Sequence, residues 1–220
     1  MTEASPAILF ENDELRVLDK PSGWHSVVGK GDLRGERSVE SWLRELEPDL
    51  DHLPEAGLVH RLDRGTSGCL IAARTLDASE ILQEELRDGR IQKRYLAVVQ
   101  GRVRQKDNFI LHFTSRYRGS KKVRVSEEGD YTVRGKCRWW RRDDLDPGPG
   151  RQTVEVDLMG AGRRHQVRAG LAHLGTPLVG DPLYGGPEAP RIMLHAWAVI
   201  IEGRRIEAPI PPGFGAETDA

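Results

Sequence analysis

An aspartate between two arginines is the first place in this sequence where charged side chains could do chemistry. Asp63 follows a short apolar run and is flanked by Arg61 and Arg64. The segment 64–68 is rich in turn-forming residues, so Asp63 should lie on a loop that leads into a strand beginning at Cys69. Positive charges within about 4 to 6 Å lower the pKa of a carboxyl group, so we expect Asp63 to be ionised at neutral pH. A positioned carboxylate can act as a nucleophile. The alternative is a structural ion pair that holds a turn, and this segment alone leaves both open.

A second cluster of hydrogen-bond donors occupies residues 162–168, whose sequence is Gly-Arg-Arg-His-Gln-Val-Arg. We expect this segment to open a helix over about 165–174, closed by Gly175. Gln166 and Arg168 then lie near the helix N-terminus, where the helix dipole favours anions. Such a site suits a phosphate or a carboxylate. Basic residues that are merely solvated are the alternative, and it also stays open.

Two further helices are predicted from caps and apolar spacing. Ser38 is a favourable N-cap for a helix that ends before Pro48. Another helix is expected to begin near Asp77 and to stop at Gly89, because glycine readily adopts the left-handed conformation that ends helices. Its predicted buried residues are Ile81, Leu82 and Leu86.

Strands outnumber these helices and do not alternate with them regularly. Two strands joined by a polar turn are expected within 7–20, and the other β-rich segments are 70–73, 94–99, 109–113, 122–125, 131–140, 152–158 and 192–201. This order predicts an α+β fold, with a mixed, mainly antiparallel central sheet and flanking helices. Rossmann and P-loop folds are excluded, because no glycine-rich turn joins a strand to a helix at their spacing.

The length of 220 residues and the hydrophobic content of 38% fit one domain over residues 1–220. We expect frayed ends at about 1–6 and 212–220, and an exposed connection over 143–150, where prolines and glycines break regular structure. No run of eighteen apolar residues and no secretory signal pattern is visible, so a cytoplasmic location is expected. Cys69 and Cys137 lack the short spacing of zinc ligands and are expected to be buried free thiols, so no metal is indicated.

Charge is distributed unevenly, although the formal net charge is only −1. Residues 1–57 hold 6 Lys and Arg against 13 Asp and Glu, whereas residues 87–142 hold 17 against 5. A basic face can therefore exist on a nearly neutral protein, and nucleic acids favour such a face. The aromatic residues interleaved with these charges are Tyr117, Tyr131, Trp139 and Trp140. A merely solvated surface is the alternative for this stretch.

Five ordered segments together resemble the RluA-type pseudouridine synthases. They are Asp-Lys-Pro-Ser-Gly at 19–23, His-Arg-Leu-Asp-Arg-Gly-Thr-Ser-Gly at 60–68, Tyr-Leu-Ala-Val-Val-Gln-Gly at 95–101, Gly-Arg-Arg-His-Gln-Val-Arg at 162–168 and Gly-Thr-Pro-Leu-Val-Gly-Asp-Pro-Leu-Tyr-Gly at 175–185. The similarity runs from about residue 8 to residue 209. It implies a single catalytic domain that isomerises uridine in RNA without a cofactor or metal.

The resemblance assigns a role to individual residues. Asp63 matches the family's nucleophile, which attacks the uridine at the base or the sugar so that the base detaches, turns and rejoins through carbon 5. Tyr95 matches the tyrosine that packs on the uracil ring and is proposed to help remove the proton from that carbon. Arg168 matches the basic residue that pairs with the nucleophile. Arg61 matches the arginine proposed to fill the gap left by the flipped uridine.

Substrate binding is further expected of His60, Arg64, Thr66, Arg163 and Gln166, which lie in the same two motifs. The family often has Thr or Ser where Arg164 stands, and this departure bears on RNA affinity or local packing rather than on the reaction. Asp181 stands in a Gly-Asp-Pro turn, where aspartate commonly hydrogen-bonds local backbone.

The expected partner is RNA, either ribosomal or transfer RNA, with no membrane, no obligate protein partner and a monomeric state. The first motif begins within twenty residues of Met1. We therefore expect the chain to lack the N-terminal RNA-binding module of many relatives. One alternative is a non-catalytic RNA-binding protein or RNA chaperone on the same fold. Another is a glycoside hydrolase, which needs a second carboxylate beside the first, and no convincing partner for Asp63 is visible in the sequence.

Overall fold

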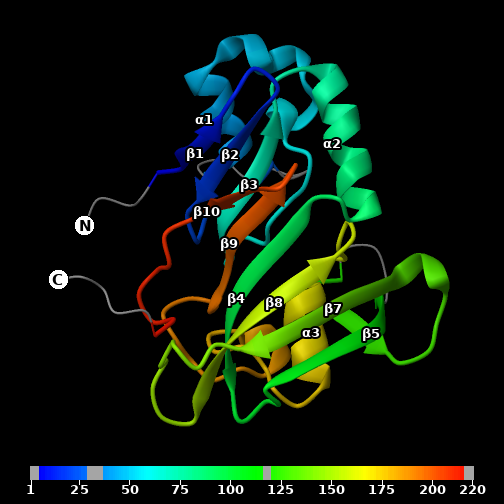
Figure 1. The fold of residues 1–220 in the computed structure, drawn as a ribbon, viewed down its shortest axis with the longest axis vertical. Helices are drawn as coiled ribbons and strands as arrows, with labels where there is room; N and C mark the ends of the chain where they lie inside the picture. Colours follow the sequence, from blue (N-terminus) through cyan, green and yellow to red (C-terminus); the bar gives the residue numbers. More distant parts are fainter. Residues whose placement is uncertain (1–4, 29–36, 116–119, 216–220) are drawn as a thin grey trace. The chain divides into compact units, whose positions relative to one another are not determined.

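The computed structural model describes residues 5–28, 37–115 and 120–215, and these form two compact units. The first unit comprises the described residues of Met1–Ile91 and Ala196–Pro209, and the second those of Gln92–His195 and Ile210–Ala220. Figure 1 traces the chain through its helices and strands. The described residues contain ten strands and three α-helices, which fits the α+β class predicted from the sequence.

The first unit is built on five strands. Its strands are β1 (Ala7–Glu11), β2 (Leu15–Lys20), β3 (Ser67–Ala73), β9 (Leu194–Ile201, which enters the unit at Ala196) and β10 (Arg204–Glu207). β1 pairs antiparallel with β2, β2 with β3, and β10 with β9, while β3 neighbours β9. The short strand β10 was not predicted from the sequence.

Two helices accompany these strands. They are α1 (Val39–Leu46) and α2 (Leu76–Asp88), and two 3-10 helices, η1 (Pro48–His52) and η2 (Pro54–Gly57), lie between them along the chain. The Ser38 side chain accepts a hydrogen bond from the Ser41 backbone N–H at 3.0 Å, which confirms the predicted N-cap of α1. Gly89 ends α2 in the left-handed conformation, as predicted.

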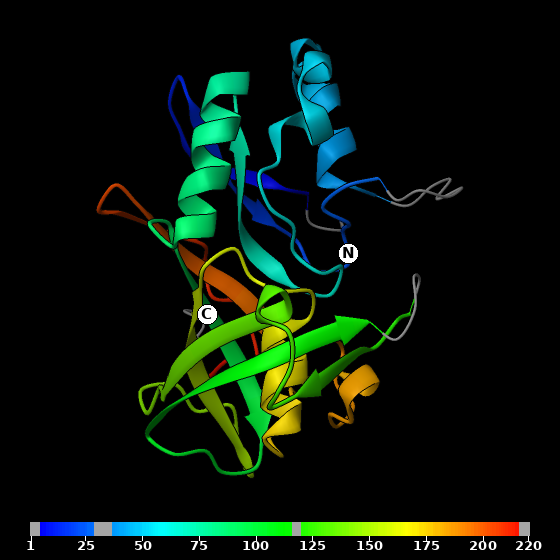
Figure 2. The same cartoon turned by 90° about the vertical axis from the view of Figure 1, so that its right-hand side faces the viewer.

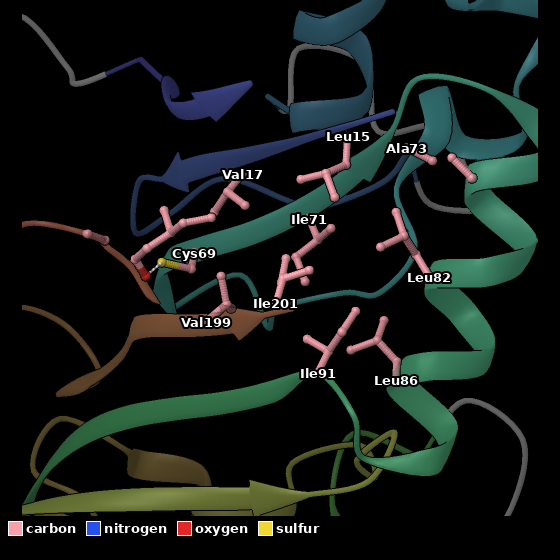
Figure 3. Packing of buried hydrophobic residues seen from close by; sticks show 13 residues of the cluster. Leu15, Val17, Cys69, Ile71, Ala73, Leu82, Leu86, Ile91, Val199 and Ile201 are labelled. Carbon is pink, nitrogen blue, oxygen red and sulfur yellow. Dashed lines mark hydrogen bonds between the residues drawn. The ribbon is translucent and has the colours of Figure 1, made fainter. Parts of the chain in front are cut away.

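α2 begins one residue before the predicted start near Asp77, whereas one of its predicted buried positions is wrong. Thr75 is the N-cap, because its extended backbone lets its hydroxyl accept a hydrogen bond from Ala78 N–H at 3.1 Å. Leu82 and Leu86 lie one turn apart on the buried face, whereas Ile81 points to the side and is 57% exposed. Figure 3 shows Leu82 and Leu86 packed with side chains of β2, β3 and β9 in the core of the first unit.

Five strands of the second unit are neighbours in the order β4-β8-β7-β5-β6. These strands are β4 (Gln92–Gln100), β5 (Lys106–Ser115), β6 (Val123–Ser126), β7 (Arg134–Arg141) and β8 (Arg151–Met159). Every pairing between neighbours in this order is antiparallel. This confirms the prediction of a mainly antiparallel arrangement.

One α-helix, α3 (Gln166–His173), and two 3-10 helices, η3 (Tyr131–Val133) and η4 (Pro182–Tyr184), complete the second unit. The α3 bounds agree with the predicted 165–174. η3 replaces the first residues of the strand predicted at 131–140, because Asp130 caps a short turn there by accepting from Thr132 N–H at 2.7 Å. The connection 143–150 is irregular, as predicted.

The prediction that the chain is frayed from residue 212 is wrong for the described part of that tail. Phe214 is fully buried, and its carbonyl accepts a hydrogen bond from the Thr153 hydroxyl at 2.8 Å. Residues 1–4 and 216–220 lie outside the described residues, as does Tyr117. Cys69 and Cys137 are free and buried, as predicted, and burial raises the pKa of each thiol to about 12.

Candidate active site

Asp63 lies at the first position of a tight turn that precedes β3. The Thr66 backbone N–H donates to the Asp63 carbonyl at 2.9 Å, which closes the turn over residues 63–66. Asp63 itself is half-buried. We call residues 62–66 the Asp63 loop.

The 20–26 loop, which contains the end of the first motif, holds the Asp63 loop through its backbone. Ser26 exchanges two hydrogen bonds with Leu62, accepting from its N–H and donating to its carbonyl, both at 2.9 Å. Gly23 N–H donates to the Arg64 carbonyl at 2.8 Å. The Ser22 hydroxyl donates to the Gly65 carbonyl at 3.0 Å. The two loops therefore form one hydrogen-bonded substructure, which fixes the turn that carries Asp63.

Lys20 lies at the centre of this substructure and is completely buried. Its ammonium group donates to the carbonyls of Pro21, Trp24 and Arg64 at 2.9, 2.7 and 3.4 Å. A buried ammonium is tolerated only when hydrogen bonds replace its hydration. Lys20 thus stabilises both loops at once. This role of Lys20 was not predicted from the sequence, because the backbone acceptors of Lys20 are defined only by the folded loops.

Replacing Lys20 by Met should loosen the Asp63 loop. The three carbonyls lose a common donor, and each buried acceptor left without one costs about 1 to 3 kcal/mol. We expect a lower free energy of unfolding in urea and faster hydrogen exchange of the Leu62 and Thr66 amides. The exposed Lys106→Met variant is the matched control and should change neither quantity. Unchanged exchange at both amides in Lys20→Met would contradict the assigned role.

The other predicted residues of this segment have distinct surroundings. His60 accepts a hydrogen bond at Nε2 from the Ile71 backbone N–H of β3 at 3.1 Å. Arg61 is exposed and its guanidinium pairs with Glu55, so one of the two arginines flanking Asp63 in the sequence is engaged elsewhere. The Arg64 Nε donates to the Gly23 carbonyl at 3.0 Å.

Thr66 differs from these residues because its hydroxyl is buried and has no hydrogen-bond partner among the described residues. Its backbone N–H closes the turn at Asp63. Buried hydroxyls are normally satisfied, so this atom is an available donor and acceptor beside Asp63. The geometry is compatible with the predicted contact to substrate.

In the second unit, α3 begins immediately after His165, whose backbone is in the left-handed region at φ 55°. Gln166 is 2% exposed and its amide is fully engaged. It accepts from Arg163 N–H at 2.8 Å and donates to the Lys136 carbonyl at 3.0 Å and to Cys137 Sγ at 3.2 Å. These contacts tie the start of α3 to β7. Gln166 therefore has a structural role, and its predicted contact with substrate has no support in this geometry.

The first two arginines of this motif donate to backbone carbonyls of neighbouring segments. The Arg163 Nε donates to the Arg134 carbonyl at 3.1 Å, and Arg163 is exposed. Arg164 donates from Nη2 to the carbonyls of Ser120 and Lys121, both at 2.7 Å. Arg164, where the family often has a small hydroxyl residue, thus fixes local packing.

Arg168 is buried and forms a two-pronged ion pair with Asp181. Nε and Nη2 of Arg168 donate to Oδ2 and Oδ1 of Asp181 at 2.7 and 2.9 Å. Arg168 is 6% exposed and Asp181 is 0% exposed. Asp181 also accepts from Leu183 N–H at 3.2 Å, which is the local backbone contact expected from its turn. The ion pair is the larger feature, and it orients the guanidinium of Arg168.

Tyr184 completes this arrangement. Its ring lies 5.5 Å from the Arg168 guanidinium carbon, and its hydroxyl accepts from Val123 N–H at 3.0 Å. The same hydroxyl lies 2.8 Å from His165 Nδ1. Burial raises the pKa of the Tyr184 hydroxyl, so it stays protonated. The segment 180–185 therefore supports the helix start that carries Arg168.

Tyr95 lies in β4, opposite Val156 of β8, and is 8% exposed. Lys93 precedes it by two residues and so projects from the same face of β4. Lys93 is 3% exposed, and its ammonium donates to the Ala161 carbonyl at 2.8 Å. Burial lowers the pKa of Lys93 from 10.5 to about 8.

This pKa shift predicts a rise in stability at alkaline pH. Below pH 8 the lysine is charged in both states, so the folded protein bears the whole cost of burying the charge. Between pH 8 and 10.5 the unfolded chain binds the proton and the folded protein does not, so the free energy of unfolding increases with pH by about 3 kcal/mol. Lys93→Met should remove this increase in urea unfolding, while the exposed Lys121→Met should retain it. Parallel pH profiles for the wild type and Lys93→Met would contradict the prediction.

Asp63 belongs to the first unit, whereas Tyr95 and Arg168 belong to the second. The pairing of Arg168 with Asp63 therefore stays a prediction. Among the described residues, no group of three or more His, Cys, Asp or Glu side chains is arranged to hold a metal ion. No helix in the described ranges is long and apolar enough to cross a membrane.

Residues 14–173 match the family described as RNA pseudouridylate synthase. This range covers well over half of the chain and contains Asp63, Tyr95 and Arg168. The chain belongs to the RNA pseudouridylate synthase family. This confirms the family predicted from the five motifs.

Bacterial relatives of this pseudouridylate synthase family member are about one-third identical to it. The Xanthomonas campestris protein named ribosomal large subunit pseudouridine synthase D is 35% identical over 184 residues, which are 81% of this chain and 51% of that protein. The Escherichia coli protein named ribosomal large subunit pseudouridine synthase C is 34% identical over 227 residues, which are 94% of this chain and 67% of that protein. The chain thus spans about half to two-thirds of the length of these relatives.

Solved structures in the same family share the fold. Human RNA pseudouridylate synthase domain containing 1 aligns with a TM-score of 0.69 at 23% identity, over 96% of this chain and 84% of that one. Human RNA pseudouridylate synthase domain containing 4 aligns with a TM-score of 0.71 at 21% identity, over 94% of this chain and 89% of that one. These likenesses confirm the predicted pseudouridine synthase fold.

Proposed function

We propose that this chain is a pseudouridine synthase that isomerises uridine within RNA, with Asp63 as its nucleophile. The family match carries the proposal, because its range holds Asp63, Tyr95 and Arg168 in the order of the family's motifs. Two local features support it. The Asp63 loop is fixed by hydrogen bonds to the 20–26 loop, and Arg168 is held by a buried carboxylate. Fixed geometry of this kind is what catalytic groups require.

The reaction is a rearrangement with no change in composition. The carboxylate of Asp63 attacks the uridine at the base or the sugar and forms a covalent bond to it, and the bond between N1 and C1′ breaks. The bond to Asp63 breaks again before the product leaves, which restores the free carboxylate. The base turns, and C5 then bonds to C1′. The proton on C5 leaves, and N1 gains a proton. Atoms and electrons balance within the nucleotide, so the proposed reaction consumes no oxidant, reductant or cofactor.

The remaining assigned residues act on the flipped nucleotide. A base inside folded RNA must leave its stack before it reacts, at a cost of a few kcal/mol. Tyr95 packs on the uracil ring and assists removal of the C5 proton, and Arg168 pairs with Asp63. Arg61 fills the vacated position in the RNA. It can do so cheaply, because its exposed pair with Glu55 contributes only about 0 to 1 kcal/mol. His60, Arg64, Thr66 and Arg163 are proposed to contact the same nucleotide or its neighbours.

We propose ribosomal RNA as the substrate in preference to transfer RNA. The names of the bacterial relatives in the large-subunit synthase groups support this choice. The enzyme is further proposed to act in the cytoplasm as a monomer, without an obligate protein partner.

Release of tritium tests the proposed reaction directly. Large-subunit ribosomal RNA is transcribed with uridine tritiated at C5 and incubated with the purified chain. Isomerisation replaces the C5 hydrogen by a carbon bond, so tritium enters the solvent in proportion to the pseudouridine formed. Transfer RNA labelled in the same way provides the comparison substrate. RNA binding without tritium release from either RNA would reject the enzymatic function and leave an RNA-binding protein.

A further inference from the structure

The second unit exposes one whole face of β5 and β7. Burial alternates along both strands, so that Phe109, Leu111 and Phe113 of β5 and Cys137 and Trp139 of β7 are buried while their neighbours are exposed or half-buried. The register places alternate residues of the two strands on one side of the sheet. We call this side the outer face. On β5, β7 and the adjoining β6 it comprises Lys106, Asn108, Ile110, His112, Thr114, Arg124, Ser126, Arg134, Lys136, Arg138 and Trp140.

The outer face is opposite the face that carries the proposed catalytic tyrosine. The register runs from Tyr95 in β4 through Val156 in β8 to Trp139 in β7, and all three are buried on the inner face. The helix α3, which carries Arg168, also packs on the inner face. A Cβ added at Gly170 of α3 would lie only 2.4 Å from the Phe109 ring. Figure 2 shows α3 alongside these strands. Residues of the outer face therefore cannot share the immediate surroundings of Tyr95.

Carboxylates compensate only part of the positive charge on this side of the sheet. The two carboxylates on the same side of β8 are Asp157 and Glu155, and both are buried beneath arginines. Arg138 pairs with Asp157 at 2.7 Å, and Arg94 and Arg142 pair with Glu155 at 3.2 and 3.0 Å.

Four exposed cations of the outer face have no carboxylate within ion-pair distance among the described residues. They are Lys106, Arg124, Arg134 and Lys136. Along β7 the basic residues recur at every second position, which spaces them by about 7 Å. A regular row of cations along a strand complements the regular charges of a phosphodiester backbone.

Aromatic rings lie among these charges. Tyr131, which precedes β7, is 72% exposed, and the Arg134 guanidinium carbon lies 4.4 Å from its ring centroid. Trp140 is half-buried, and the Arg94 guanidinium carbon lies 4.7 Å from its ring centroid. Cationic grooves with exposed rings are how proteins bind unpaired nucleotides without reading sequence. Trp139, the neighbour of Trp140, is buried at 4% exposure and has no such role.

We infer that the outer face is a second RNA-binding surface, which holds phosphodiester backbone away from the uridine that is modified. The inference rests on the proposed function, because that function makes RNA the partner. A large folded RNA contacts this face with a segment other than the one that enters the catalytic site. The outer face then adds affinity and positions the substrate without touching the reacting atoms.

Removing charges from the outer face tests its contribution to RNA binding separately from that of the catalytic site. In the outer-face variant, Lys106, Arg134 and Lys136 are each replaced by Gln. In the matched control, the exposed residues Arg87, Arg102 and Arg204 are each replaced by Gln, which removes the same charge elsewhere. Binding of a large-subunit ribosomal RNA transcript is measured across a salt series, together with tritium release from the labelled transcript.

The outer-face variant should bind the transcript about tenfold more weakly than the control variant. The slope of log affinity against log salt should fall by about two to three, since each lost phosphate contact removes close to one released counterion. Tritium release at saturating RNA should keep its wild-type kcat, while KM rises. Tyr131→Leu should weaken binding without changing the salt slope, because stacking releases no counterions.

Each contrary result has its own meaning. Equal affinity and salt slope in the outer-face and control variants would overturn the second surface. Loss of kcat at saturating RNA in the outer-face variant would also overturn it, because the face would then belong to the catalytic machinery. Binding by the wild type without tritium release would reject the proposed function alone. Failure of the wild type to bind the transcript would reject both.

Discussion

Asp63→Asn abolishes the release of tritium from C5-labelled RNA while the protein stays folded and still binds RNA. Asparagine has nearly the shape of aspartate but lacks an ionised oxygen, so it cannot form the bond to the uridine that the mechanism requires. Loss of a nucleophile that acts together with other groups lowers turnover by at least about a thousandfold. Single-turnover assays with enzyme in excess over RNA measure this loss without interference from product release.

The Asp63→Asn variant must also stay folded and bind RNA, so that its loss of activity can be assigned to the missing nucleophile. The backbone of the Asp63 loop, not its carboxylate, makes the hydrogen bond to Thr66. Asparagine keeps the shape of the side chain and leaves this backbone hydrogen bond in place, so thermal unfolding should shift little in Asp63→Asn. The matched control is Asp13→Asn, an exposed aspartate in the turn between β1 and β2, which should keep full activity. Turnover in Asp63→Asn within tenfold of the wild type would remove Asp63 from the role of nucleophile.

The sequence predicted the ends of helices correctly where one residue with a strong conformational preference determines the end. Ser38 caps α1 and Gly89 ends α2 because serine and glycine have intrinsic preferences for those positions. The observed start of α2 at Leu76 lies one residue from the predicted start near Asp77. The exposure of Ile81 depends on which face of α2 packs on the core, and apolar spacing alone did not decide that face.

Sequence motifs did not predict the hydrogen-bond and ion-pair partners that are distant in the sequence. The sequence placed Asp63 on a loop, yet it gave no sign that Lys20 and Ser26 hold that loop, since their partners are backbone atoms more than thirty residues away. Similarly, Asp181 was assigned to a local turn, and its ion pair with Arg168 was missed. One signal was available. An arginine on the buried face of a helix requires an acid nearby, because buried charges are paired.

The sequence predicted that the chain has a basic face, but it did not predict where on the fold this face lies. The excess of Lys and Arg over residues 87–142 indicated a basic face. The register of β5 and β7 shows where part of this face lies. Successive side chains of β7 alternate between the two sides of the sheet, so Lys136 and Arg138 are exposed and Cys137 is buried. Sequence alone could not assign the carboxylates Asp157 and Glu155 to three of the arginines. The cations left unpaired are therefore a finding of the structure.

The second large effect is expected from Asp181→Asn. This substitution removes the negative charge of the buried carboxylate that pairs with Arg168. Breaking a buried ion pair by removing one partner costs about 3 to 5 kcal/mol, so urea unfolding should show a loss of this size. Catalysis should fall further than stability explains, because the guanidinium of Arg168 loses the two hydrogen bonds that orient it. The activity is measured as kcat at a temperature where the variant is fully folded.

A double substitution tests whether the Arg168–Asp181 ion pair positions a catalytic group or only stabilises the fold. Arg168→Met combined with Asp181→Leu replaces the ion pair by apolar side chains of similar volume, a change that often restores stability. If the pair served the fold alone, this variant would be stable and active. We expect it to be stable and inactive, because the proposed partner of Asp63 is gone. The exposed Glu188→Gln variant, from the same segment of the chain, controls for charge and should keep both properties. Stable protein with wild-type kcat in the double variant would show that catalysis does not depend on Arg168, and the assignment of Asp181 as its positioning residue would fail with it.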